Sequence, residues 1–176
     1  MEATPTHQDL VLRCREGRRD AQYDLYRLYS RAMYNTALRM LQNAHDAEDV
    51  LQSVFMEVFA KIDTFRFESS LGSWIKRITI NKCINFLKSR RLTLQELTAG
   101  FDRLPEEDAP PEPEYNVERI NRAIGELPDG YRVVFSLYAV EGYDHEEIAQ
   151  ILQISEATSK SQYSRAKAKL RGMLQS

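Results

Sequence analysis

The sequence predicts an all-α protein with two small helical domains, joined by a flexible, acidic and proline-rich linker. Apolar residues recur every three or four positions along most of the chain, which is the period of an amphipathic helix. Only 7 of the 176 residues are glycine, and alternation of β-branched and polar residues, typical of strands, is absent. We expect domains at 8–92 and 116–174. The linker at 93–115 contains four prolines among acidic residues, a composition that cannot bury a core.

The first domain is predicted to begin with a short helix, Leu10 to Arg15, which Gly17 stops. Asp20 is a candidate N-cap for a long second helix that reaches about Leu41. A third helix, from about Asp46 to Ile62, has an apolar stripe and an opposite face at i, i+3, i+4 and i+7. That opposite face consists of Asp49, Gln52, Ser53 and Met56. A polar outer face is ordinarily only solvated, so the pattern alone assigns it no function.

Residues 63–70, DTFRFESS, predict a loop, after which Ser69 or Ser70 caps a helix that continues to about Arg90. The apolar phase of this helix changes after Ile78, which predicts a bend or a new packing partner near Asn81. Aromatic rings and cations are interleaved in the loop and helix, an arrangement that suits stacking and backbone contacts with unpaired nucleic acid. Taken singly, Phe65 and Trp74 are better explained as core residues, and it is the segment as a whole that favours binding to a single strand.

The second domain predicts helices at 117–126, 129–140, 145–152 and 156–174. Asp144 and Glu147 have capping-box spacing, and Ser155 is the expected N-cap of the last helix. Two helices joined by three residues, with the second one basic, indicate a helix-turn-helix that inserts into the DNA major groove. The alternative is a small bundle with a charged outer helix.

The net charge of −2 conceals a strong segregation of charge. No acidic residue lies between Glu68 and Glu96, and none follows Glu156, whereas both segments are rich in lysine and arginine. Basic patches of this kind are the electrostatic footprint of phosphate binding. The acidic residues gather instead at 102–114, within the predicted linker.

These residues resemble a known family. DAEDVLQSVFMEVFAKIDTFRFESSLGSWIKRITINKCINFLKSRR is similar to region 2 of the extracytoplasmic-function sigma factors, a subfamily of the sigma-70 proteins of bacterial RNA polymerase. ELPDGYRVVFSLYAVEGYDHEEIAQILQISEATSKSQYSRAKAKLR is similar to their region 4. The resemblance spans about residues 8–172 and implies a promoter-specificity subunit. It also implies three partners, which are core RNA polymerase, promoter DNA and an anti-sigma factor.

The resemblance implies a role for each surface. Core polymerase would bind Asp49, Gln52, Ser53 and Met56. The unpaired −10 strand would be bound by Phe65, Arg66, Phe67, Trp74, Lys76, Arg77, Asn81, Lys88 and Arg90. The −35 duplex would be bound by Thr158, Lys160, Ser161, Ser164, Arg165 and Lys167. The chain departs from the family's usual glycine at Phe67 and Gln153, from its usual apolar residue at Ser159 and from a common arginine at Gln162.

The sequence also bears on two other classes of protein. A free-standing helix-turn-helix regulator would bind duplex DNA without polymerase, but it has no need of the aromatic and basic segment that starts at Phe65. An enzyme would need a catalytic constellation, and the scattered histidines form none; there is no P-loop, nucleophile elbow or dinucleotide motif. We therefore expect no catalytic residues, no metal and no cofactor.

Location and cysteine state follow from composition. The sequence contains no run of about 18 apolar residues, which a membrane-spanning helix would require. The first ten residues, MEATPTHQDL, lack the basic and apolar segments of a signal peptide. We therefore expect a cytoplasmic protein. Cys14 and Cys83 have no zinc or redox spacing, so we expect both to be small buried residues.

Overall fold

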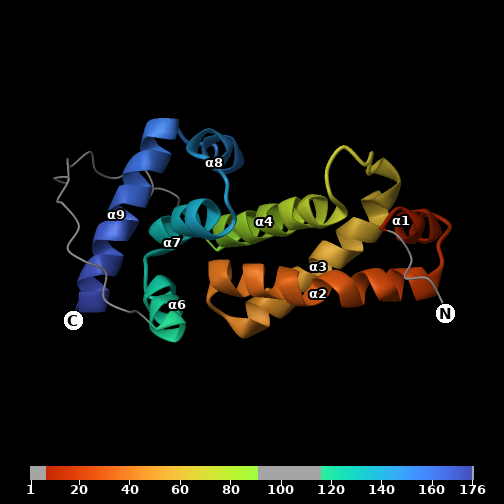
Figure 1. Ribbon diagram of the computed structural model, residues 1–176, viewed down its shortest axis with the longest axis horizontal. Helices are drawn as coiled ribbons and strands as arrows, with labels where there is room; N and C mark the ends of the chain where they lie inside the picture. The colour runs from red at the N-terminus through yellow and green to blue at the C-terminus, as the bar shows by residue number, and fades with distance from the viewer. Residues whose placement is uncertain (1–6, 91–115, 176) are drawn as a thin grey trace. The chain divides into compact units, whose positions relative to one another are not determined.

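The computed structural model describes residues 7–90 and 116–175, and within these ranges every regular element is a helix (Figure 1). The chain divides into two compact units, residues 1–86 and 87–176. The predicted all-α fold is confirmed for the described residues. The predicted linker, 93–115, lies outside them, as does Arg91. No helix in the described ranges combines the length and apolar character needed to cross a bilayer.

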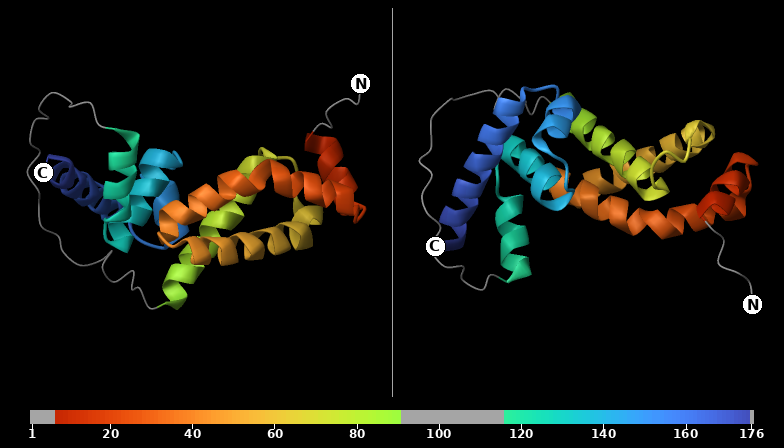
Figure 2. Two further views of the ribbon diagram at one scale, coloured as in Figure 1. Left: turned by 90° about the horizontal axis from the view of Figure 1, so that it is seen from below. Right: turned by 45° about the horizontal axis from the view of Figure 1, so that its top comes forward.

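The first unit is built around a pair of long antiparallel helices, which the views of Figures 1 and 2 show side by side. Its elements are α1 (His7–Arg15), α2 (Arg19–Leu41), α3 (Ala44–Lys61), the 3-10 turn η1 (Ile62–Thr64) and α4 (Leu71–Ser89). The two helices of the pair, α2 and α3, are joined at Gln42, whose left-handed φ of 53° reverses the chain. Asn43 then caps α3 by accepting a 3.0 Å hydrogen bond from the backbone N–H of Asp46. Because Asn43 provides the cap, α3 begins two residues before the predicted start.

Asp20 does not cap α2, contrary to the prediction. The helix begins at Arg19 with Arg18 in the N-cap position, and Asp20 lies in its first turn. The Asp20 carboxylate accepts hydrogen bonds from Arg18, at 2.9 Å, and from Arg13 of α1, at 2.5 Å. These hydrogen bonds lower the pKa of Asp20 to about 2. Asp20 therefore ties α1 to α2, which a sequence-based search for caps does not reveal.

Helix α4 runs without interruption from Leu71 to Ser89. Ser70 caps it, since its Oγ accepts a 3.1 Å hydrogen bond from the backbone N–H of Ser73. The predicted change of apolar phase has a simple origin, because Thr79 and Cys83 are both buried and fill the gap in the stripe. Thr79 satisfies its hydroxyl with a 3.0 Å hydrogen bond to the Ile75 carbonyl.

Both cysteines are buried, as predicted. Burial raises the pKa of the Cys14 thiol, and it raises the pKa of Cys83 to about 12. At neutral pH the two side chains are therefore thiols, and they serve as small apolar residues of the first unit.

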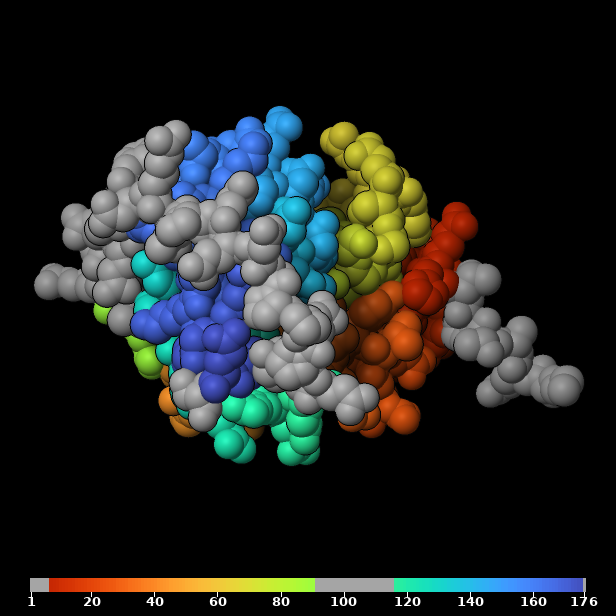
Figure 3. Space-filling view, turned by 60° about the vertical axis from the view of Figure 1, so that its left-hand side comes forward, coloured from red at the N-terminus to blue at the C-terminus, as the bar shows by residue number. Residues whose placement is uncertain are grey.

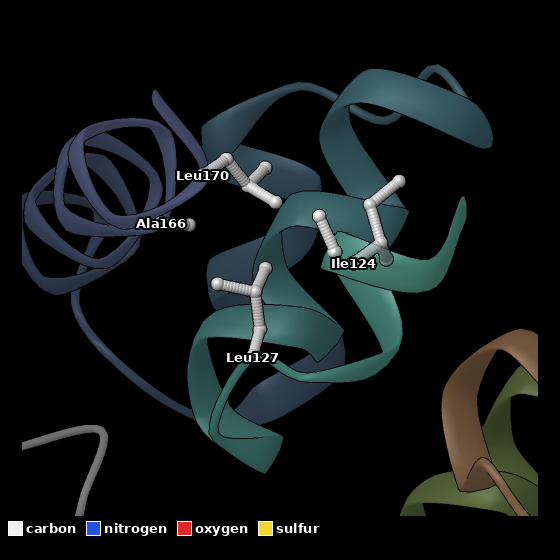
Figure 4. Close-up of a cluster of buried hydrophobic side chains, with 5 residues drawn as sticks. Ile124, Leu127, Ala166 and Leu170 are labelled. Atoms are coloured by element: carbon white, nitrogen blue, oxygen red, sulfur yellow. The ribbon is translucent and has the colours of Figure 1, made fainter. Parts of the chain in front are cut away.

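The second unit consists of helices that pack on the long C-terminal helix. They are α6 (Val117–Gly125), α7 (Asp129–Phe135), the π-helical turn η2 (Ser136–Val140), α8 (His145–Leu152) and α9 (Glu156–Gln175). Figure 4 shows how Ile124 and Leu127 meet Ala166 and Leu170 of α9 to form a buried cluster. The helices predicted at 117–126, 145–152 and 156–174 match α6, α8 and α9 to within one residue. The helix predicted at 129–140 ends in the π-helical turn, where the Glu141 N–H bonds the Ser136 carbonyl over 3.0 Å.

Arg132 is a buried cation within this unit, with 5% of its surface exposed. Its guanidinium donates a 2.8 Å hydrogen bond to the carbonyl of Leu127 and forms an ion pair with Asp129. A further 3.5 Å contact reaches the carbonyl of Gly125, the last residue of α6. Arg132, a residue of α7, therefore donates to carbonyls at and just beyond the end of α6, while Asp129 in the first turn of its own helix balances its charge.

Candidate nucleic-acid and polymerase interfaces

The polar face predicted on α3 is exposed along its whole length. Asp49, Gln52, Ser53 and Met56 all lie on the surface, while Val54, Phe55 and Val58 of the same helix are buried. Met56 is 74% exposed, the largest exposed fraction among the large apolar side chains of the described residues. Exposure of a large apolar side chain beside polar ones is typical of a protein-binding surface.

Three aromatic rings, of Phe65, Phe67 and Trp74, pack against one another where the loop after η1 leads into α4. Phe65 is the middle ring, with its centroid 4.9 Å from that of Phe67 and 5.2 Å from that of Trp74. Phe65 is only 4% exposed, so its ring is covered and cannot stack on a base in this conformation. Phe67 is 43% exposed and Arg66 lies on the surface beside it. Phe65 therefore lies beneath the surface, whereas Arg66 and Phe67 lie on it, and contact of any of the three with DNA stays a prediction.

Phe67 adopts a backbone conformation that is unusual for its residue type. Its φ is 59°, in the left-handed region that glycine enters freely and that costs other L-residues about 1–2 kcal/mol. Its ring contacts compensate for this cost, since it lies against Phe65 and under the guanidinium of Arg15, 5.4 Å from the ring centroid. The φ explains why glycine suits this position, and the contacts explain how a phenylalanine is held there.

Helix α4 places four of the predicted strand-contacting residues on one face, because their spacing is three, four and seven positions. These are Trp74, Arg77, Asn81 and Lys88. Asn81, Lys88 and Arg90 are exposed, whereas Trp74, Lys76 and Arg77 are half-buried. Lys82 faces α3 instead, where its Nζ lies 2.7 Å from Oε2 of Glu57. The other carboxylate oxygen of Glu57 lies 2.5 Å from Nζ of Lys61. Both ammonium groups lower the pKa of Glu57.

The helix-turn-helix has the caps that its sequence predicts. Asp144 and Glu147 form a reciprocal capping box, with hydrogen bonds of 2.8 and 2.9 Å. Gln153 ends α8 with a left-handed φ of 58°, and Ser155 then caps α9 by accepting a 3.0 Å hydrogen bond from the Thr158 N–H. These hydrogen bonds fix the angle at which α9 leaves the turn, as insertion of a helix into a groove requires.

The predicted DNA-contacting residues of α9 lie on or near its surface. Lys160, Ser164 and Lys167 are exposed, and Thr158, Ser161 and Arg165 are half-buried. Lys160 is bound by Glu156, one turn earlier, at 2.6 Å. Lys167 lies over the ring of Tyr163, 4.8 Å from its centroid. Three of these cations and hydroxyls are therefore exposed, and three are half-buried, along the first turns of a capped helix.

The residues Ser159 and Gln162 are buried on the inner face of α9. The Oγ of Ser159 lies 2.9 Å from Nδ1 of His145, the first residue of α8. His145 stacks on Tyr138 at 4.4 Å, and Tyr163 of α9 completes the set. These contacts join the two helices of the helix-turn-helix to each other.

Comparison with known proteins identifies the family. The family model for sigma-70 region 2 matches residues 25–93, and the model for sigma-70 region 4 matches residues 117–170. The ECF RNA polymerase sigma factor SigE of Mycolicibacterium smegmatis is 31% identical over 86% of this chain, and the match covers 60% of that protein. SigW of Bacillus subtilis, named in the same way, is 29% identical over 93% of this chain and 94% of its own length. The chain belongs to the extracytoplasmic-function sigma factors.

Solved structures agree with this assignment. The sigma factor RpoE of Bartonella quintana, in complex with the anti-sigma factor NepR, superposes with a TM-score of 0.58 at 25% identity. That match covers 87% of this chain and 96% of the other. CnrH, in complex with the cytosolic domain of CnrY, gives a TM-score of 0.57 at 25% identity over 94% of this chain and 95% of the other. As a sigma factor, the protein directs promoter-specific transcription.

The buried polar residues of the sigma factor's α9 were not predicted as core. The buried face of α9 contains the apolar residues Ala166 and Leu170, and it continues toward the N-terminus at helical spacing through Gln162 and Ser159. Positions 159, 162, 166 and 170 are three or four residues apart, so they lie on one face of the helix. This spacing is the signal that could have placed Ser159 and Gln162 in the core. Polar side chains hide such a signal because a hydropathy pattern counts them as surface. In the described ranges of this sigma factor, no three His, Cys, Asp or Glu residues are grouped to hold a metal.

We predict that the second unit of the sigma factor loses stability as the pH falls below about 6.5. Burial, and then the positive charge of Lys160, lower the pKa of His145 from its ordinary value of 6.5. The unfolded chain therefore takes up a proton on this residue at a higher pH than the folded chain, which favours unfolding in acid. The measurement is a series of urea titrations at pH 7.5 and 5.5, followed by the NMR signals of Ala166.

The His145→Gln variant should show a smaller loss between these two pH values. His45→Gln, which changes an exposed residue of α3, is the control and should retain the full loss. Equal pH dependence in the wild type and in His145→Gln would contradict the prediction.

Proposed function

We propose that this sigma factor binds bacterial core RNA polymerase and divides promoter recognition between its two domains. Domain 8–92 would bind the core enzyme and the unpaired −10 strand, and domain 116–174 would bind the −35 duplex. One observation carries the proposal: a single chain combines a capped, outward-facing helix-turn-helix with an aromatic and basic surface suited to unpaired bases. The alternative, a free-standing duplex-binding regulator, leaves the second surface without a use.

The −10 interaction is proposed to act by capturing bases after they unstack. Removal of a base from the duplex costs a few kcal/mol, and stacking on an aromatic ring returns about 1–3 kcal/mol per base. Phe67 and Trp74 would supply the rings, and Asn81 has both a donor and an acceptor for a base edge. Lys88, Arg90 and the half-buried cations of α4 would hold the sugar–phosphate backbone.

The −35 interaction is proposed to use the first turns of α9. An α-helix fits the major groove, where short side chains permit close approach and long cations reach base acceptors or phosphates. Ser161 and Ser164 provide the short side chains, and Lys160, Arg165 and Lys167 the cations. Binding of Lys160 to DNA would require it to leave Glu156, its present partner at 2.6 Å.

The remaining parts of the proposal rest on sequence and on relatives. The acidic linker 93–115 would thread toward the RNA path of polymerase, where its carboxylates resemble the phosphates of RNA. An anti-sigma factor is the proposed regulator, because two structural relatives were solved with such a partner or with a cytosolic domain bound. We propose that the protein acts in the cytoplasm as a regulator, without catalytic residues of its own.

Run-off transcription with core RNA polymerase on genomic fragments, followed by mapping of start sites, tests the proposed function. Start sites should appear only when the sigma factor is added, and they should share −10 and −35 elements. Absence of both core binding and initiation would overturn the proposal. Tight, specific duplex binding without core enzyme would favour the regulator instead.

Substitution of alanine for Lys160 or Arg165 should weaken transcription that depends on the −35 element by about tenfold. A lost phosphate or base contact of this kind costs about 1–3 kcal/mol. Affinity for core polymerase, measured by fluorescence anisotropy, should stay unchanged. Gln52→Ala should give the reverse pattern, with weaker core binding and normal −35 dependence; unchanged core affinity in Gln52→Ala would show that this face is assigned wrongly.

A further inference from the structure

The loop between α3 and α4 is held from outside by a residue of α1. The side chain of Arg15 reaches this loop across some fifty positions of sequence and makes three contacts there. Its Nε donates a 3.2 Å hydrogen bond to the carbonyl of Ile62, and its terminal nitrogen donates to the carbonyl of Phe65. Its guanidinium also lies over the ring of Phe67. Figure 3 shows α1, in red, standing beside the yellow residues that lead into α4.

The fold brings Arg15 to this position for identifiable reasons. Leu10, Val11 and Cys14 are buried and fix the rotation of α1, which packs on both α2 and η1. Arg15 is the last residue of α1, four positions after Val11, so it lies on the flank of the buried stripe. Gly17 then turns the chain away with a φ of 74°.

The three contacts act on a segment that two buried side chains, Ile62 and Phe65, anchor in the core, but whose backbone makes few hydrogen bonds of its own. Within Ile62–Phe67, one 3.3 Å hydrogen bond joins the Phe65 N–H to the Ile62 carbonyl, and Thr64 bonds back to Lys61. The backbone then enters the left-handed region at Phe67. An arginine fork that spans two carbonyls fixes the spacing of both, and its planar face can stack on a ring at the same time.

We propose that Arg15 is a positioning residue for base selection: it holds the Ile62–Phe67 segment and the Phe67 ring in the conformation that receives the unpaired strand. The inference rests on the proposed −10 function and adds α1 to the machinery, although α1 presents no residue to DNA in that proposal. The reason is pre-organisation. A ring that is already fixed loses less freedom when a base stacks on it.

The test compares Arg15→Gln with the wild type, both assembled with core polymerase. The promoter is one from which the wild type initiates. On this promoter we expect the rate of open-complex formation to fall about tenfold in Arg15→Gln, a loss typical of a displaced positioning group. Selection from a promoter library randomised across the −10 element measures the base profile, which is the frequency of each base at each −10 position among the selected promoters. In Arg15→Gln this profile should be flatter, because the preference for one base at each position is weaker. Affinity for core polymerase should remain within about twofold, because the exposed face of α3 is untouched.

Two further variants separate positioning from general stability. Arg15→Lys keeps the charge but cannot span two carbonyls or stack as a plane. Its folding stability should therefore be close to that of the wild type, while its base profile should stay nearly as flat as that of Arg15→Gln. Arg13→Gln is the matched control, since Arg13 is a half-buried arginine of the same helix that binds Asp20 and does not contact the loop. It should lower the melting temperature and leave the base profile sharp.

A double-variant cycle tests the link to Phe67. Phe67→Gly removes the stacked ring and places a residue that tolerates the left-handed backbone. If Arg15 acts through this ring, the combined loss in Arg15→Gln/Phe67→Gly should be smaller than the product of the two single losses. Strictly multiplicative losses would overturn the coupling.

The outcome distinguishes this inference from the proposed function. Failure of the wild type to initiate with core polymerase removes the function itself. Normal initiation by the wild type, together with an unchanged base profile in Arg15→Gln, removes only the role of Arg15. An equally flattened profile in Arg13→Gln would assign the effect to α1 as a whole and would also overturn it.

Discussion

Replacement of Arg132 by alanine should lower the free energy of unfolding of the second unit by about 2–4 kcal/mol. The guanidinium is buried and is bound by Asp129 and by the carbonyl of Leu127. Its removal leaves the Asp129 carboxylate and the carbonyl of Leu127, in the turn between α6 and α7, without their donor, and it also opens a cavity. Urea unfolding followed by NMR signals of α6 and α9 measures the effect, and −35-dependent transcription should fall with it.

Two variants define the source of this loss. Arg132→Lys retains the charge but has no planar fork, so it should recover only part of the stability. Arg122→Ala removes an exposed arginine of α6 and should change the free energy of unfolding by less than about 0.5 kcal/mol. A stability of Arg132→Ala close to that of the wild type would show that the buried ion pair contributes no net stability.

The second large effect is expected at Met56. An aspartate there should weaken binding to core polymerase about 30-fold or more, because a central apolar contact is worth about 2 kcal/mol and a buried charge adds to the loss. Met56 is 74% exposed in the free protein, so the substitution should leave the melting temperature unchanged. Anisotropy titration of labelled protein with core enzyme gives the affinity directly.

Leu28→Asp is the matched control for Met56. Leu28 is also a large exposed apolar residue of the first unit, but it lies on α2 and outside the predicted face. Its replacement should leave core affinity within about twofold of the wild type. Equal losses from both substitutions would mean that the docking surface extends well beyond the α3 face, and no loss from Met56→Asp would refute the assignment.

Helical periodicity predicted most of the fold because the amphipathic pattern is strong and the caps are conventional. Ser70, Asp144 and Ser155 are all polar residues directly before an apolar repeat, and each is a cap in the structure. Asp20 has the same local appearance, but two arginines bind its carboxylate within the first turn. Local sequence gives no means to weigh such a tertiary ion pair against a cap.

Long-range contacts decided what the sequence left open at the candidate sites. Phe65 and Phe67 are alike in type and two positions apart, yet one ring is buried between Phe67 and Trp74 and the other is exposed. The contacts of Arg15 across the fold have no signal in the sequence at all. By contrast, the two positions where the chain departs from a usual glycine, Phe67 and Gln153, both have a positive φ. The departure itself therefore pointed to a special backbone conformation.

The π-helical turn Ser136–Val140 accommodates one more residue than the α-helical path it replaces. Each residue of an α-helix advances the chain by about 100° around its axis. An extra residue in an unbroken α-helix would rotate everything beyond it by that angle, and the wider π-helical turn absorbs this rotation. A one-residue deletion within Ser136–Val140 should therefore restore regular winding and leave α8 and α9 in phase with α7, at the cost of local contacts such as the stack of Tyr138 on His145.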